Sequence, residues 1–205
     1  MIPSQTTHPE LDAFKAHKKI PKIIENNVLI ALSHYPELKE TSIDFVFKKD
    51  IKKSVMQAQP KIGSLLNGKD GRAYQINISA MFKLTHSVVP IHQLPDSIMI
   101  GWIGHELGHI MDYENRSTLG ILRFGLGYLF SEYYLKKAEV TADTYAVNHG
   151  LGPYIIDTKR YILDNTDLPE AYKARIARLY LSPNDIVEQV RKLEEAKEAK
   201  EKAKL

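Results

Sequence analysis

The sequence predicts an α+β fold that is mainly helical and has a small mixed β-sheet. Several long segments have apolar residues at helical spacing, and shorter segments between residues 43 and 80 alternate as strands do. The chain has 205 residues, of which 43% are hydrophobic and 26% charged, so it can bury a sizeable core. We expect a single domain over residues 1–183 and a charged, helical C-terminal tail over residues 184–205.

The N-terminal part is expected to contain one or two helices and then three strands. Residues 9–34 have an apolar face at helical spacing, formed by Ile20, Ile23, Ile24, Val28, Leu29 and Leu32. The expected strands are residues 43–47, 55–59 and 73–80, with Pro60 ending the second and a turn region at 67–71. In the last of these strands apolar and polar residues alternate, which is typical of a half-buried strand.

A long buried helix is expected over about residues 96–113. Pro95 precedes it, and Asp96 or Ser97 can cap its free amide groups. Apolar residues then recur at helical spacing: Ile98, Trp102, Ile103, Leu107, Ile110 and Met111.

This helix contains the pentapeptide His105-Glu106-Leu107-Gly108-His109, which has the HExxH pattern of zinc hydrolases. Histidines four positions apart lie on the same face of a helix, close enough to bind one metal ion, and Glu106 can reach a water on that ion. The pattern arises by chance in roughly one chain of this size in a hundred, so it needs support from its context. The alternative is a pair of core histidines with satisfied hydrogen bonds.

A second motif, Glu139-Val140-Thr141-Ala142-Asp143, begins thirty positions after His109. Zn²⁺ bound by two histidines usually takes a third protein ligand and leaves its fourth position to water, and Glu139 is the candidate. Asp143, one turn later, can accept a hydrogen bond from the non-ligating nitrogen of His105. Alone, this segment is more typical of a solvated helix face. Together, the motifs predict a Zn²⁺ site formed by His105, His109 and Glu139.

These motifs resemble those of the gluzincin metallopeptidases, and within them most closely the HtpX and CaaX-prenyl protease group. The similarity extends over about residues 70–180 and includes the segments 142–147, 150–153 and 175–179, which follow that group's order of helix, glycine turn and arginine-bearing helix. It implies a zincin-like domain that hydrolyses a peptide or protein substrate, with Glu106 as catalytic general base. It also implies that the strand at 73–80 borders the cleft, the alternative being an interior strand.

The resemblance leaves open which residue stabilises the oxyanion. That group usually has a His-Pro pair shortly before the arginine-bearing helix, whereas this chain has Asp167-Leu168-Pro169-Glu170. Arg175 is our candidate for the transition-state donor, with Tyr145, Tyr172 and His149 as alternatives.

Residues 119–130, between the two motifs, form an apolar run that Arg123 interrupts. The run is too short for a helix to cross a bilayer. We expect it to pack into the core, the alternatives being a mobile lid or a peripheral membrane contact.

Composition excludes several other classes of protein. A net charge of +3 argues against a nucleic-acid partner, and the densest basic run, at 48–53, is interpreted as a solvated turn. The absence of cysteine excludes disulfides and thiolate zinc ligands. No transmembrane helix and no apolar signal segment are predicted, so we expect a cytoplasmic chain, or an exported one if a leader has been removed.

A second functional hypothesis is a zinc-binding regulator or scaffold. The ImmA and IrrE group has a similar HExxH and Glu-x-x-Ala pattern and would imply one specific protein partner. Glu106 favours an enzyme, because a scaffold needs no base beside its metal. A latent peptidase, with residues 119–130 closing the cleft, would have the same sequence signals.

Overall fold

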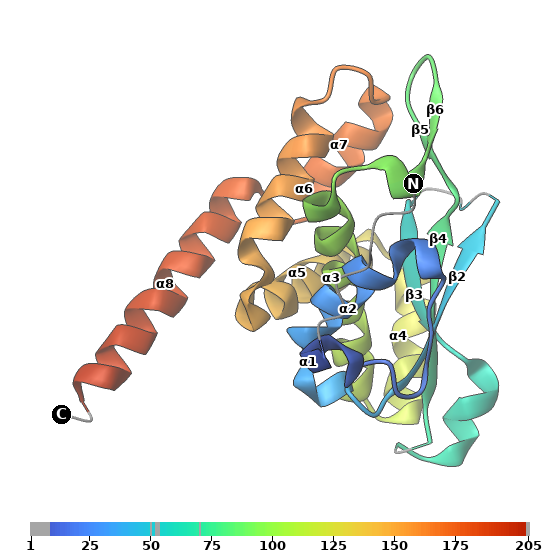
Figure 1. The fold of residues 1–205 in the computed structure, drawn as a ribbon, viewed down its shortest axis with the longest axis vertical. Helices are drawn as coiled ribbons and strands as arrows, with labels where there is room; N and C mark the ends of the chain where they lie inside the picture. The colour runs from blue at the N-terminus through green and yellow to red at the C-terminus, as the bar shows by residue number, and fades with distance from the viewer. Residues whose placement is uncertain (1–8, 50, 52–53, 70, 204–205) are drawn as a thin grey trace.

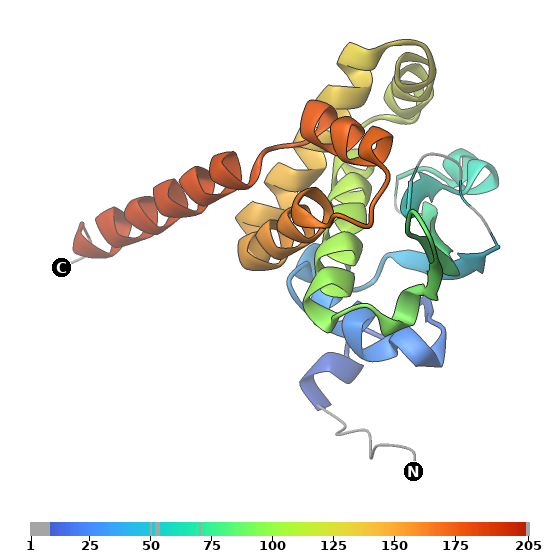
Figure 2. The ribbon, with the colours of Figure 1, turned by 90° about the horizontal axis from the view of Figure 1, so that it is seen from above.

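The computed structural model describes residues 9–49, 51, 54–69 and 71–203 and has the mixed α+β architecture that the sequence predicts. A four-stranded sheet lies on one side of the central helix α3 (Asp96–Glu114), and α5 (Glu132–Ala146) and α6 (Gly152–Asp164) lie on the other (Figures 1 and 2). The remaining helices are α1 (Pro9–Asp12), α2 (Glu25–Ser33), α4 (Thr118–Phe130), α7 (Glu170–Leu179) and α8 (Pro183–Lys202). The N-terminal segment 1–5 and much of the basic run at 48–53 lie outside the described residues.

Residues 9–34 contain two helices, α1 and α2, separated by the short strand β1 (Lys18–Lys19) and the 3-10 helix η1 (Lys22–Ile24). The apolar face of α2 packs into the core as predicted, since Val28 and Leu32 are fully buried. Ile23, by contrast, is exposed, because it lies in η1 rather than on the face of a continuous helix.

The sheet has the strand order β1-β2-β4-β3. Strand β2 (Ser42–Lys48) is parallel to β1 and to β4 (Ala73–Ser79), whereas β3 (Met56–Pro60) is antiparallel to β4. The interior alternative for residues 73–80 is therefore correct, and the expectation that this strand borders a cleft is wrong. Strand β3 forms the edge of the sheet next to β4, and Pro60 is tolerated there because an edge strand does not need every backbone N–H in the ladder.

Helix α3 is the centre of the core, and all its residues from Ile98 to Tyr113 are buried. It follows a two-stranded sheet, β5 (Met81–Lys83) and β6 (Val88–Pro90), and begins at Asp96 as predicted. The predicted cap is wrong. Pro95 occupies the N-cap position and makes no side-chain bond, and the Asp96 carboxylate instead accepts a hydrogen bond of 2.8 Å from Asn27 Nδ2 of α2.

Glycines allow α3 to approach α5 and α6 closely. A Cβ atom at Gly108 would lie 2.4 Å from the backbone oxygen of Ala142 in α5, and one at Gly101 would lie 2.5 Å from the backbone oxygen of Tyr154 in α6. The small residues of α5 are all buried at this contact: Ala138, Ala142 and Ala146. The close contact brings the HExxH segment next to the Glu139 segment.

Replacing Gly108 with alanine is expected to destabilise the protein by about 1–3 kcal/mol, because the new methyl group would overlap the backbone of α5. Gly125→Ala in α4 is the matched control. A Cβ there meets nothing within 4 Å, so the better helix propensity of alanine should raise the free energy of unfolding by up to about 1 kcal/mol. Urea denaturation of both variants measures the difference, and equal effects would contradict the close contact.

Residues 119–130 form α4, which packs with only one of its faces. Ile121 and Phe124 are buried, whereas Leu119, Leu126 and Phe130 are largely exposed. The expectation of a segment packed into the core is thus correct for the inner face only. No helix in the described ranges is long and apolar enough to span a membrane.

The C-terminal tail forms the expected helix, α8, which projects from the rest of the chain (Figures 1 and 2). A capping box between Ser182 and Asp185 begins it, and Ile186 anchors its first turns in the core. Its outer part is solvated and has ion pairs at helical spacing, including Glu188 with Lys192 at 3.4 Å and Glu198 with Lys202 at 3.9 Å.

Candidate metal centre

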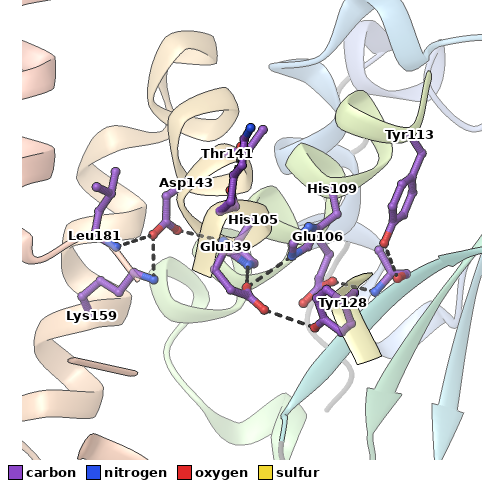
Figure 3. A network of polar contacts seen from close by, with 12 residues as sticks. His105, Glu106, His109, Tyr113, Tyr128, Glu139, Thr141, Asp143, Lys159 and Leu181 are labelled. Carbon is purple, nitrogen blue, oxygen red and sulfur yellow. Dashed lines mark hydrogen bonds and ion pairs between the residues drawn. The ribbon is translucent and has the colours of Figure 1, made fainter. Parts of the chain in front are cut away.

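Three predicted ligands converge where α3 contacts α5 (Figure 3). His105 Nε2 lies 3.1 Å from Glu139 Oε2, and His109 Nε2 lies 3.4 Å from the same oxygen. The ligand atoms of the three residues all lie within 4.8 Å of one another, and all three side chains are buried. This group can hold a metal ion.

The hydrogen bonds around the two histidines fit a cation at this point. His105 Nδ1 lies 2.8 Å from Asp143 Oδ1, so a proton on Nδ1 is donated to that carboxylate and the Nε2 lone pair faces Glu139 Oε2. Two acceptors that face each other repel unless a proton or a metal lies between them. His109 Nδ1 is buried and has no hydrogen-bond partner among the described residues.

The centre also has an excess of buried negative charge. Glu106, Glu139 and Asp143 are buried together, and the buried Lys159 forms an ion pair with Asp143. Burial by itself would lower the pKa of His105, but Asp143 and Glu139 outweigh it and raise that pKa to about 10. The surroundings thus favour added positive charge. A divalent cation supplies that charge while both histidines stay neutral.

Asp143 is fully buried and binds three groups (Figure 3). Besides His105, its carboxylate accepts hydrogen bonds from Lys159 Nζ of α6 at 3.1 Å and from the backbone N–H of Leu181 at 3.2 Å. Burial raises the pKa of Asp143, but Lys159 and His105 together hold it below the usual value. The contact to His105 is the one predicted from the sequence, whereas Lys159 and Leu181 were not predicted.

Glu106 lies beside the ligands and is connected to the edge strand. Its Oε2 accepts a hydrogen bond of 2.6 Å from the backbone N–H of Ala58 in β3, and the Tyr113 hydroxyl donates to the backbone oxygen of Ala58 at 3.4 Å. Burial raises the pKa of Glu106, although His109 and His105 oppose the shift. The edge strand therefore fixes one oxygen of the carboxylate.

A cavity of about 790 Å³ opens beside Glu106, His109 and Glu139. Its walls come from β3, the 3-10 helix η3 (Ile62–Asn67), α3 and α4, together with Arg175 and Tyr180. The edge of β3 that pairs with no other strand thus lies next to the candidate metal centre.

Of the four candidate oxyanion donors, Arg175 lines this cavity. Tyr172 lines a smaller neighbouring cavity of about 30 Å³. The other two lie outside both cavities: the Tyr145 hydroxyl accepts a hydrogen bond from Asn115, and His149 bonds the backbone oxygen of Tyr145 and Glu37. Tyr145 and His149 therefore do not face the cavity beside Glu106.

Two tyrosines that were not predicted lie at the centre. The Tyr128 hydroxyl of α4 donates to Glu139 Oε1 at 3.2 Å, and the Tyr180 ring lies 5.4 Å from the His105 ring. Burial raises the pKa of Tyr128 far above neutrality, so its hydroxyl remains a donor. Tyr128 follows the buried Phe124 by four positions, and this spacing was the signal in the sequence that it belongs to the inner face of α4.

Replacing Tyr128 with phenylalanine is expected to weaken metal binding by about tenfold. The hydroxyl binds Oε1 of Glu139 while Oε2 faces the two histidines, so its loss frees the carboxylate to rotate. Competition with a chromogenic chelator measures the dissociation constant. Tyr133→Phe, at an exposed position next to α4, is the control and should bind metal as the wild type does. Equal affinities for both variants would exclude this role of Tyr128.

Comparisons of the chain with family models, curated proteins and solved structures gave no match. Function is therefore inferred from the residues and geometry of the site.

Proposed function

We propose that the chain is a zinc-dependent metallopeptidase of the gluzincin type, similar to a soluble form of the HtpX and CaaX-prenyl protease catalytic domain. The main support is the buried group of His105, His109 and Glu139 with the Glu106 carboxylate beside it in a cavity. Two histidines and one carboxylate suit Zn²⁺ and also iron(II). A carboxylate positioned as a base beside the ion favours zinc-assisted hydrolysis.

A zinc ion held by His105, His109 and Glu139 would act as a Lewis acid, polarising the scissile carbonyl and lowering the pKa of a bound water toward about 7. Glu106 takes a proton from the attacking water and passes it to the leaving amine as the C–N bond breaks. The N–H of Ala58 fixes one oxygen of Glu106, so the other is available for the proton. Arg175, in the cavity wall, is the candidate donor to the oxyanion.

The edge strand supports a peptide as substrate. Ser79 N–H donates to Val55 O and Lys61 N–H donates to Ala73 O, so the odd-numbered residues of this segment bond to β4. In an antiparallel pair the intervening residues direct their backbone groups to the free edge, and these are Met56 and Ala58. An extended peptide can pair with that edge by strand addition. The backbone groups of Ala58 already bond Glu106 and Tyr113, so those of Met56 are the ones open to a peptide.

The test combines metal analysis with a cleavage profile of a diverse peptide library. We expect about one zinc per chain and cleavage that stops with a chelator and returns when zinc is restored. Protein without a bound transition metal would contradict the site. Zinc-loaded protein that cleaves no peptide would instead favour a regulator or a latent peptidase. The latent form has one observation in its favour, since the backbone N–H of Ala58 already bonds the Glu106 carboxylate.

A further inference from the structure

Helix α4 has a second apolar face, on the side away from the core. Leu119, Leu122, Leu126 and Phe130 follow one another at intervals of three and four residues, so they form one stripe along the helix. Each is 52% to 84% exposed, whereas Ile121 and Phe124 on the opposite side are buried. The stripe has no partner among the described residues.

A second exposed apolar element lies across the cavity from this stripe. In η3, Ile62 is 81% exposed and Leu66 is 89% exposed. Ile62 lines the same cavity as Leu122 and Leu126, so η3 and α4 border its mouth together. Leu66, Leu119 and Phe130 do not line the cavity, and a ligand inside it would therefore leave them uncovered.

The one charged residue of η3 and α4 is basic, and the exposed Glu132 that follows α4 is paired with Arg178 at 3.3 Å. Neither η3 nor α4 contains an acidic residue, although 25 of the 205 residues of the chain are Asp or Glu. Arg123 is exposed on α4 beside the stripe, and Lys136 and Lys137 are exposed in the first turns of α5. Arg123, Lys136 and Lys137 have no ion-pair partner within the described part of the chain. Their charges are thus available to an anionic surface.

We propose that the stripe of α4 and the exposed side chains of η3 dock on an anionic lipid membrane, with the mouth of the cavity facing it. The 13 residues of α4 span about 20 Å, less than the hydrocarbon thickness of about 30 Å, so the helix lies along the surface. Surface-bound helices insert leucine and phenylalanine side chains below the headgroups while arginine and lysine contact anionic lipids. The docking is independent of whether the cavity is catalytic.

Flotation of the full chain with vesicles of phosphatidylcholine, with and without phosphatidylserine, tests the proposal. The wild type should float with vesicles that contain phosphatidylserine and should be released at high salt, because salt screens the basic residues. Leu119→Glu/Phe130→Glu should bind at least about tenfold more weakly, since two inserted side chains become charged. Both positions lie outside the cavity, so zinc content and cleavage of a soluble peptide should be unchanged.

The double variant Ile23→Glu/Val187→Glu is the matched control, because it charges two exposed apolar positions elsewhere on the surface, 58% and 46% exposed. It should float as the wild type does. A wild type that binds no vesicle, or a stripe variant that floats as strongly as the control, would overturn the proposal. Sedimentation velocity provides the other decisive outcome: self-association that the stripe variant abolishes would identify a second copy of the chain as the partner.

Discussion

Glu106→Gln is expected to lower peptide hydrolysis by two to four orders of magnitude while zinc stays bound. The amide cannot take a proton from the attacking water. It keeps the size of the side chain, and its oxygen can still accept the hydrogen bond that Ala58 N–H donates to Glu106 at 2.6 Å. Because burial already disfavours the charged carboxylate, the melting temperature should be unchanged or slightly higher.

The matched control is Glu114→Gln, which makes the same chemical change at the last residue of α3, outside the cavity. It should cleave at the wild-type rate. The measurement is kcat/KM on a peptide from the library, together with zinc content and a melting curve. A Glu106→Gln protein that binds zinc and cleaves as fast as the wild type would show that the peptidase mechanism is wrong.

Glu139→Ala is expected to weaken zinc binding by more than the ten- to hundredfold typical for loss of an outer contact, because it removes a ligand. His109→Ala should have the same effect. Both changes leave the pair of Asp143 and Lys159 intact, so a loss of zinc would not follow from a broken buried ion pair.

The comparison is the double variant Asp143→Asn/Lys159→Met. It removes the carboxylate that orients His105 without leaving an ammonium group buried and unpaired. Its zinc affinity should fall by about ten- to a hundredfold, less than for Glu139→Ala. Chelator competition at one pH measures all three variants. The opposite order would mean that the roles of Glu139 and Asp143 are exchanged.

Local spacing in the sequence was sufficient to predict the parts of the site that lie on one helix. The four-residue interval between His105 and His109, and that between Glu139 and Asp143, fix a shared face wherever the helix lies. The extent of α3 followed from Pro95 and from apolar residues around the helix, because burial is required along its whole length.

The parts that depend on contacts between distant segments were not predictable in the same way. Alternation shows that residues 73–80 form a strand, but it does not show that β3 pairs outside it and becomes the edge. Lys159 reaches Asp143 from α6, and Tyr128 reaches Glu139 from α4. Each is an ordinary helical residue until the packing of those helices is known.

The position of the three ligands on two separate helices has a consequence for how the chain is held together. His109 and Glu139 are thirty residues apart, and an ion bound to both would close that segment into a loop. A cross-link that closes a loop of this length lowers the conformational entropy of the unfolded chain. It thereby raises the free energy of unfolding by roughly 3 to 4 kcal/mol. The chain has no cysteine. The metal would therefore serve as the cross-link that a disulfide provides in other proteins. Unlike a disulfide, this cross-link reforms reversibly and does not depend on the redox state of its surroundings.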